Sequence, residues 1–234
     1  MIHGLPGSSR DFRWLASALG DRVRTIRLEQ PGFGQTPHET ESGTTLAHRA
    51  RFAIEAIDAL GLDRFAVLGH SIGGPVAMAV AAAAPARVTA LALLASVGLH
   101  PHRLARKTPR HPDLARLLSL RLVQRAVLPG MRRGFRAVGF PASTPDGELI
   151  QCTRVFSRLS FEDNRRAAFG VRAPTLIAWA DDDRLVEPAI GLSLSPVLPA
   201  GPRLAFPEGG HNIQKTHAVE LADALVAHLA RATR

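Results

Sequence analysis

Residues 65–74 read FAVLGHSIGG, and this short stretch decides how the chain folds. It begins with an apolar run typical of a buried strand and continues into small residues typical of a helix, with Ser71 at the turn between them. Gly69 and Gly73 lie two residues before and after the serine, where so tight a turn has no room for larger side chains. We therefore expect an exposed serine hydroxyl, with the backbone N–H of Ile72 at the positive end of a helix dipole. This local geometry suits acyl transfer.

The pentapeptide G-x-S-x-G is a weak signal alone, because glycine and serine are common in loops. Its setting strengthens it, since no other serine of the chain lies between a buried-strand pattern and an alanine-rich helix pattern. The alternative is a glycine-rich turn whose serine has no chemical role.

The composition is that of one globular domain with an insertion. The 234 residues are 46% hydrophobic and 21% charged, which provides enough apolar material for a sizeable core. No apolar stretch approaches the roughly 20 residues that span a bilayer, so no membrane span is predicted. Cys152 is the lone cysteine and no leader pattern opens the chain, so a cytoplasmic location is expected. No G-x-G-x-x-G, phosphate loop or metal motif occurs, so no cofactor and no metal are expected. The sequence leaves the oligomeric state open.

The net charge of +9 is concentrated in one segment. Residues 98–168 contain 14 Lys and Arg against 5 Asp and Glu, whereas the rest of the chain is balanced. One interpretation is a solvated, arginine-rich helical face. The other is a positive lid that attracts anionic substrates or an acidic membrane surface. Nucleic acid is not expected as a partner, because tyrosine is absent and few aromatic residues are available to stack on bases.

Strand and helix patterns alternate along most of the chain. Continuous apolar strands between helices predict the α/β class, with a mostly parallel sheet covered by helices on both faces. Reactive groups of such sheets gather at the carboxyl ends of the strands. The predicted strands are 23–28, 65–68, 88–95, 175–179 and 203–206, and the predicted helices are 11–19, 46–60, the segment after Ser71, and 218–230.

The middle of the chain breaks this alternation. Residues 98–168 show no strand-like run, whereas leucines recur there at helical spacing and capping patterns are present. We therefore expect a helical insertion that divides the core into residues 1–97 and 169–234. Because the insertion follows the strand 88–95, it emerges at the same end of the sheet as Ser71 and can cover it as a cap.

A serine hydroxyl needs a nearby base, itself oriented by an acid, to act as a nucleophile at neutral pH. The strand 175–179 runs into three aspartates at 181–183, and the strand 203–206 runs toward His211. Both places are strand ends, and the order serine, acid, histidine occurs among triads built on such sheets. A histidine of an ordinary loop is the alternative for His211.

Other histidines receive plainer interpretations. His70 is expected to pack beneath the turn rather than to react. His100 and His102 flank a proline, and two such ligands without carboxylate or cysteine support favour a solvated loop over a metal site.

Taken in order, these motifs resemble those of the α/β-hydrolase superfamily over nearly the whole chain. Residues 3–7 (HGLPG) are similar to its HG-x-PG oxyanion turn, and residues 31–34 (PGFG) to its PGFG loop. Residues 69–74 (GHSIGG) match its nucleophile turn, residues 181–186 resemble its acid turn, and residues 210–211 match the turn that carries the base. The resemblance implies the fold, a catalytic triad and a helical cap.

The resemblance also selects among the three aspartates. Asp183 falls on the matching frame, three residues after Ala180, and is expected to be the acid. Asp182 is a poorer second choice, and Asp181 is expected to be a solvated turn residue.

By resemblance, Ser71 attacks an acyl carbon, His211 carries the proton, Asp183 holds the imidazole, and the amides of Leu5 and Ile72 stabilise the oxyanion. The expected function is a serine hydrolase that acts on a small carboxylic ester or lactone. A hydrolase of carbon–carbon bonds in dienoic acids would use the same residues, and the basic insertion would suit its carboxylate. A catalytically silent ligand-binding protein of this fold is a further alternative. Dehalogenases and epoxide hydrolases of this fold carry an aspartate where Ser71 stands.

The start of the chain departs from the superfamily pattern. The turn at residues 3–7 normally ends a buried strand that follows an N-terminal hairpin, yet only Met1 and Ile2 precede it here. Two strands and most of a third are therefore expected to be missing. An open sheet edge of that kind would invite instability or pairing with another chain.

Overall fold

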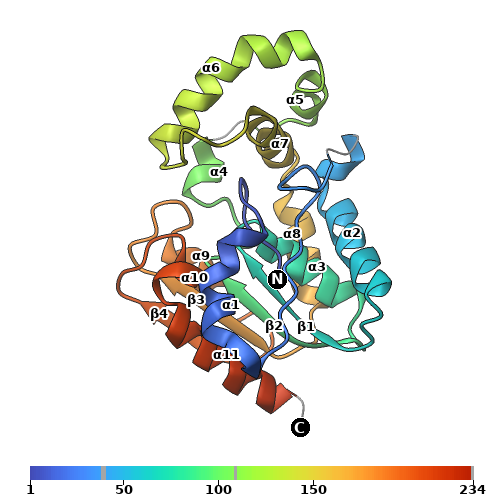
Figure 1. Cartoon of the computed structure of the whole chain (residues 1–234), viewed down its shortest axis with the longest axis vertical. Helices are drawn as coiled ribbons and strands as arrows, with labels where there is room; N and C mark the ends of the chain where they lie inside the picture. The colour runs from blue at the N-terminus through green and yellow to red at the C-terminus, as the bar shows by residue number, and fades with distance from the viewer. Residues whose placement is uncertain (38–40, 108–109, 233–234) are drawn as a thin grey trace.

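A four-stranded parallel sheet forms the centre of the computed structural model, which describes residues 1–37, 41–107 and 110–232. The strands lie in the order β1-β2-β3-β4, and helices cover both faces (Figure 1). The predicted α/β class with a mostly parallel sheet is thereby confirmed. The strands are β1 (Phe65–His70), β2 (Val88–Leu94), β3 (Thr175–Ala180) and β4 (Arg203–Phe206).

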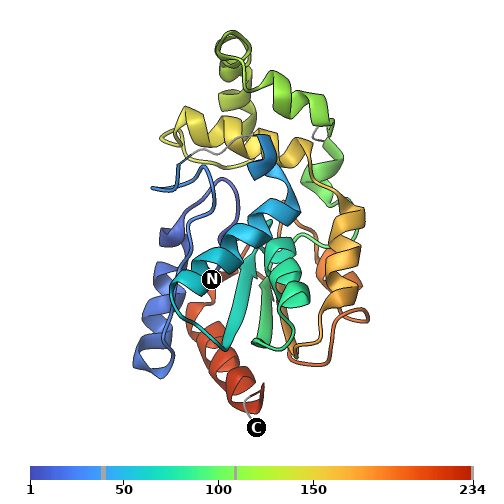
Figure 2. The same cartoon turned by 90° about the vertical axis from the view of Figure 1, so that its right-hand side faces the viewer.

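Successive buried residues of the inner strands β2 and β3 face two different cores, because side chains alternate across a sheet. In β2, Leu91 and Leu93 pack into one core, whereas Ala92 and Leu94 pack into the other. Helices α2, α3 and α8 cover the first face, and α1, α10 and α11 cover the second (Figures 1 and 2). Burial on both faces explains why the strands read as continuous apolar runs.

Helices make up the rest of the regular structure. In the part of the chain that the structure describes, no helix is long and apolar enough to cross a membrane. The α-helices are α1 (Arg13–Leu19), α2 (Leu46–Ala59), α3 (Gly73–Ala83), α4 (Arg103–Lys107), α5 (Pro112–Leu117), α6 (Arg121–Ala137), α7 (Asp146–Ser157), α8 (Phe161–Gly170), α9 (Pro188–Leu194), α10 (Ile213–Thr216) and α11 (Ala218–Ala232), and the 3-10 helices are η1 (Ser9–Phe12), η2 (Gly20–Arg22) and η3 (Glu41–Thr44).

The predicted strand at residues 23–28 is wrong in extent. Only Leu28 pairs there, in a single parallel bridge to Ile2, which in turn bridges Gly69 of β1. Among the described residues, Met1 and Ile2 run beside this segment: the amine of Met1 donates to Ile26 O across 2.7 Å and Leu28 N–H donates to Met1 O across 3.0 Å, which is too short a pairing for a strand.

Helices α4 to α7 lie beyond the carboxyl ends of the strands, and α6 is the outermost element (Figures 1 and 2). Helix α7 supplies buried side chains that join this layer to the core. Its Cys152 and Phe156 belong to one apolar cluster with Leu5 and Ile72 near the strand ends. Helix α6 packs on α7 and has no buried residue. Helix α8 then returns along α3 toward β3.

The register brings the ends of the strands to one edge. His70 of β1 pairs with Leu94 of β2, Leu94 with Ala178 of β3, and Ala180 with Phe206 of β4. The segments that follow β1, β3 and β4 therefore emerge side by side. These segments carry the serine, the three aspartates and the histidine of the sequence motifs.

Candidate active site

Ser71 occupies a sharp turn between β1 and α3. Its φ of 54° lies in the left-handed region, which a residue with a side chain seldom adopts. The turn is closed because Ser71 N–H donates to Leu94 O, and Gly74 N–H donates to Ser71 O, both across 3.0 Å. A side chain at Gly69 would place its Cβ 2.6 Å from the Cα of Gly74, and one at Gly73 would collide with the backbone of Ile2. The glycines are therefore required by contact, as the pentapeptide predicts.

The structure brings Ser71, His211 and Asp183 together in a chain of hydrogen bonds. Because a carboxylate only accepts, His211 Nδ1–H donates to Asp183 Oδ2 across 2.8 Å. This leaves Nε2 of the same ring to accept from the Ser71 hydroxyl, also across 2.8 Å. The serine hydroxyl thus faces the nitrogen that is able to take its proton.

Asp183 is buried, with 2% of its surface exposed, and is held by the backbone. Its Oδ1 accepts from Leu185 N–H across 2.8 Å and from Val186 N–H across 3.0 Å. Burial by itself would raise the pKa of Asp183, but the hydrogen bonds from His211 and the two amides outweigh it and lower that pKa. The carboxylate is therefore ionised at neutral pH and oriented before any substrate binds.

The two neighbouring aspartates do not contact the histidine ring. Asp182 Oδ1 accepts from Gly210 N–H across 2.7 Å, which ties the acid turn to the turn that carries His211. Asp181 is exposed, and its backbone N–H pairs with Phe206 O. Of the three candidates at 181–183, Asp183 is thus the one whose side chain meets the imidazole.

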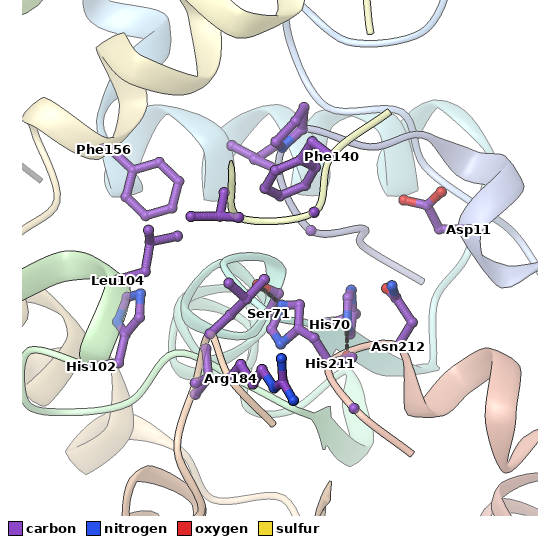
Figure 3. A pocket seen from close by; sticks show the side chains of 18 of the residues that line it. Asp11, His70, Ser71, His102, Leu104, Phe140, Phe156, Arg184, His211 and Asn212 are labelled. Carbon is purple, nitrogen blue, oxygen red and sulfur yellow. Dashed lines mark hydrogen bonds between the residues drawn. The ribbon is translucent and has the colours of Figure 1, made fainter. Parts of the chain in front are cut away.

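His70 lies beneath the turn, as expected, and also supports His211. Because a carbonyl only accepts, His70 Nε2–H donates to the backbone oxygen of His211 across 2.9 Å. The two rings lie 4.9 Å apart at 49° (Figure 3). Burial lowers the pKa of His70 to about 3, so the ring stays neutral and keeps this donor at ordinary pH. His70 therefore positions the backbone of His211.

The turn at residues 3–7 approaches Ser71 closely. A Cβ at Gly4 would lie 2.9 Å from Ser71 Cβ and 3.0 Å from His70 Nδ1. Leu5 is buried and lines the cavity described below, and Ile72 is the N-cap residue of α3. The two residues expected to supply oxyanion donors therefore flank Ser71 on separate segments.

A buried polar network fixes that turn. His3 Nδ1–H donates to Gly4 O across 2.6 Å, and His3 Nε2 accepts from Gln30 N–H across 3.1 Å. Gln30 in turn donates through its amide to His3 O and accepts from the buried guanidinium of Arg49. Burial lowers the pKa of His3 to about 4, which keeps the ring neutral and this pattern intact at neutral pH.

A cavity of about 620 Å³ opens at Ser71 (Figure 3). Its ionic lining consists of Asp11, Asp182 and Arg184. Apolar groups come from the turn at 4–6, from α7 and from the segment that follows α6. In the described part of residues 98–168, no lysine or arginine lines the cavity. The basic charge of the insertion therefore lies elsewhere on its surface.

His102 also lines the cavity, which corrects the expectation of a solvated loop for this residue. It is 1% exposed, packs against the rings of Phe156 and Phe161, and leaves its Nδ1 buried without a hydrogen-bond partner. Burial, assisted by the nearby His211, lowers the pKa of His102 to about 4. The one signal in the sequence was its place after β2, because the rings of Phe156 and Phe161 that contact it come from distant helices. His100 is exposed, as expected.

Comparisons with known proteins bear on the fold family of the chain. A family model described as the alpha/beta hydrolase fold matches residues 1–163. The chain is 28% identical to a 2-hydroxy-6-oxononadienedioate/2-hydroxy-6-oxononatrienedioate hydrolase of Paraburkholderia phymatum, over 93% of this chain and 82% of that protein. It is 27% identical over 98% of its length to the dihydrolipoyllysine-residue acetyltransferase component of an acetoin cleaving system from Pseudomonas putida, but spans only 62% of that protein.

Among solved structures, a thermophilic esterase from Thermogutta terrifontis superposes with a TM-score of 0.73. The superposition covers 99% of this chain and 89% of the esterase at 18% identity, so it establishes the fold alone. The family model covers well over half of the chain and includes the turn that carries Ser71. The chain belongs to the α/β-hydrolase fold family.

Proposed function

We propose that this chain is a serine hydrolase that works through an acyl-enzyme. The observation that carries the proposal is the unbroken hydrogen-bond chain from Ser71 through His211 to Asp183, which ends on a cavity able to hold a small substrate. Membership of the family supports a hydrolase. The carboxylate of Asp183 is ionised and accepts hydrogen bonds from two backbone N–H groups, which supports proton transfer from Ser71 to His211. Hydrolase is the broad conclusion, and ester or lactone hydrolysis is the specific one.

In the proposed reaction, Ser71 Oγ bonds to the substrate's carbonyl carbon while its proton passes to His211 Nε2. The carbonyl oxygen becomes an oxyanion. When the tetrahedral intermediate collapses, the bond to the leaving oxygen breaks and His211 returns the proton to that oxygen. Water then attacks the acyl-enzyme in the same way, giving up its proton to His211 and releasing the acid and free Ser71. Asp183 stays ionised and stabilises the imidazolium in both halves.

The backbone N–H groups of Leu5 and Ile72 are the proposed oxyanion donors. The position of Ile72 at the start of α3 supports this role, because helix N-termini favour negative charge. The buried network around His3 supports the role of Leu5, because a donor contributes most when its position is fixed beforehand. Loss of one such donor typically costs about 2.7–4 kcal/mol of barrier.

Residues 98–168 act in this proposal as a cap over a core of residues 1–97 and 169–234. Helices α4 to α7 supply the cover, and α7 seals the cavity through Phe156. The ionic lining of the cavity carries two acidic groups and one basic group, which favours a neutral acyl substrate over an anionic one. The cytoplasm is the proposed location.

Carbon–carbon bond hydrolysis of dienoic acids is a second candidate. The P. phymatum hydrolase supports it, because that protein is named for dienoic and trienoic diacid substrates and the match covers 93% of this chain. Arg184 is the lining residue that could pair with a carboxylate of such a substrate. A catalytically silent binding protein is the alternative from another class.

Pre-steady-state hydrolysis of p-nitrophenyl esters tests the proposal. A serine hydrolase whose acyl-enzyme forms faster than it is hydrolysed releases a burst of about one p-nitrophenolate per chain before steady turnover. The Ser71→Ala variant should still bind the substrate, but it should show neither the burst nor the steady release of p-nitrophenolate. Turnover of a dienoic carbon–carbon substrate, with no turnover of esters or lactones, would favour the second candidate. Binding without any Ser71-dependent turnover would favour the silent protein.

A further inference from the structure

The outer, exposed face of α6 carries a basic stripe. Helix α6 contains five arginines and no acidic residue, and none of its residues is buried. At 3.6 residues per turn, all five arginines fall within about a third of the helix circumference. The opposite face, with Val127, Met131 and Phe135, is half-buried. The stripe consists of Arg121, Arg125, Arg132, Arg133 and Arg136.

Exposed leucines lie at the end of this stripe. Leu122 is 81% exposed, Leu120 is 54% exposed, and Leu117 at the end of α5 is 49% exposed. These residues surround the α5–α6 junction, in the layer at the end of the molecule opposite the C-terminus (Figures 1 and 2). Three large apolar side chains at one junction are more than a solvated helical face requires.

We propose that the stripe and the three leucines dock the cap on an anionic lipid surface. Arginines supply attraction to acidic headgroups, and the leucines insert at the boundary between headgroups and acyl chains. The residues that follow α6, from 138 to 141, line the cavity at Ser71. The C-terminal end of the stripe therefore lies next to residues that line the cavity. The inference concerns binding alone and does not depend on the proposed reaction.

Two other partners fit this surface less well. Nucleic acid would engage the arginines, but it leaves the leucines unused, and no aromatic residue lies on the outer face of α6 to stack on a base. A two-fold pair with a second copy would place one arginine stripe against the other, and like charges repel. The only ion pair on the stripe among the described residues joins Arg132 to Asp146, so most of its charge is not neutralised locally.

Vesicle flotation tests the docking with the whole chain. We expect binding to phosphatidylcholine vesicles that contain phosphatidylglycerol, weak binding to phosphatidylcholine alone, and a loss of binding as salt rises. The variant Arg121→Gln/Arg125→Gln/Arg133→Gln should bind the anionic vesicles about a hundredfold more weakly. Leu120→Ala/Leu122→Ala should bind them about tenfold more weakly without losing the salt dependence.

A matched control removes the same charge from the core. Arg24→Gln/Arg27→Gln/Arg64→Gln changes three exposed arginines outside the cap and should bind anionic vesicles like the unchanged chain. Ser71→Ala should also bind them normally, so docking and catalysis are tested separately. The proposal would be overturned if the core triple variant lost as much binding to anionic vesicles as the stripe variant does. It would also be overturned if the unchanged chain bound both vesicle types equally. Stripe-dependent dimerisation or binding to duplex DNA in the absence of vesicle binding would overturn it as well.

Discussion

Replacing Asp183 by asparagine should leave the fold intact and disable the proton relay. The reason lies in Oδ1, which accepts from the backbone N–H groups of Leu185 and Val186. An asparagine must keep its carbonyl oxygen at that place, because its NH₂ group would meet two donors there. The NH₂ group then faces His211 Nδ1 and turns that nitrogen into an acceptor. The ring proton moves to Nε2, which can no longer take the proton of Ser71.

The size of the effect follows from these contacts. Restoring the working tautomer requires the amide to flip, which leaves two buried N–H donors unpaired at about 1–3 kcal/mol each. That penalty, together with loss of the negative charge beside the imidazolium, lowers kcat by about 10³–10⁴. Asp182→Asn is a matched control, because its Oδ1 accepts a single hydrogen bond from Gly210 and an amide oxygen accepts it too. We expect less than about a fivefold change in kcat for that variant.

Steady-state hydrolysis of a p-nitrophenyl ester measures both variants, and urea unfolding shows whether each is folded. The reasoning is refuted if folded Asp183→Asn keeps kcat within a factor of ten of the unchanged chain. It also fails if Asp182→Asn loses as much activity as Asp183→Asn, because the two changes would then act through the turn and not through the relay.

Three further changes have expected outcomes. Gly4→Ala should lower kcat by about 10²-fold or more, because its Cβ would lie 2.9 Å from Ser71 Cβ and displace the oxyanion turn; unchanged ester turnover would contradict this. Gly130→Ala meets no atom within 4 Å and should raise the free energy of unfolding by about 0.5–1 kcal/mol in urea titrations, with kcat unchanged. His102 has a folded-state pKa of about 4, below the unfolded value, so its contribution to stability is complete above about pH 6.5 and is lost as pH falls toward 4. His102→Phe should therefore reduce the slope of unfolding free energy with pH in that window by about 1.4 kcal/mol per pH unit, and an unchanged slope would show that His102 does not titrate this way.

The sequence predicts those parts of the fold that depend on local pattern and burial together. The four strands at residues 65–68, 88–95, 175–179 and 203–206 are observed within a few residues of the prediction. In β2 and β3, burial on both faces leaves an apolar run that few other structures produce, whereas β4 is an edge strand with no buried residue. The strand at 23–28 failed because a strand needs a partner along its length, and alternation alone cannot supply one.

The candidate site likewise has parts that the sequence pattern predicts and parts that it does not. The places of Ser71 and His211 follow from turns at strand ends, where chain direction fixes where a side chain emerges. Contacts made by packing between distant segments were not predictable from pattern. His102 is buried where it packs against Phe156 of α7 and Phe161 of α8, and His70 finds its acceptor 141 residues further along the chain. A histidine in a loop looks the same in sequence whether or not a cap covers it.

Labelling with a fluorophosphonate, followed by peptide mass spectrometry, tests the central claim most directly. Phosphonylation requires a serine oxygen activated by a neighbouring base, so it reports the relay without knowledge of the substrate. We expect one modified residue, Ser71, with labelling abolished in Ser71→Ala and strongly slowed in His211→Gln. An unmodified Ser71 in folded protein, or equal labelling after loss of His211, would contradict it.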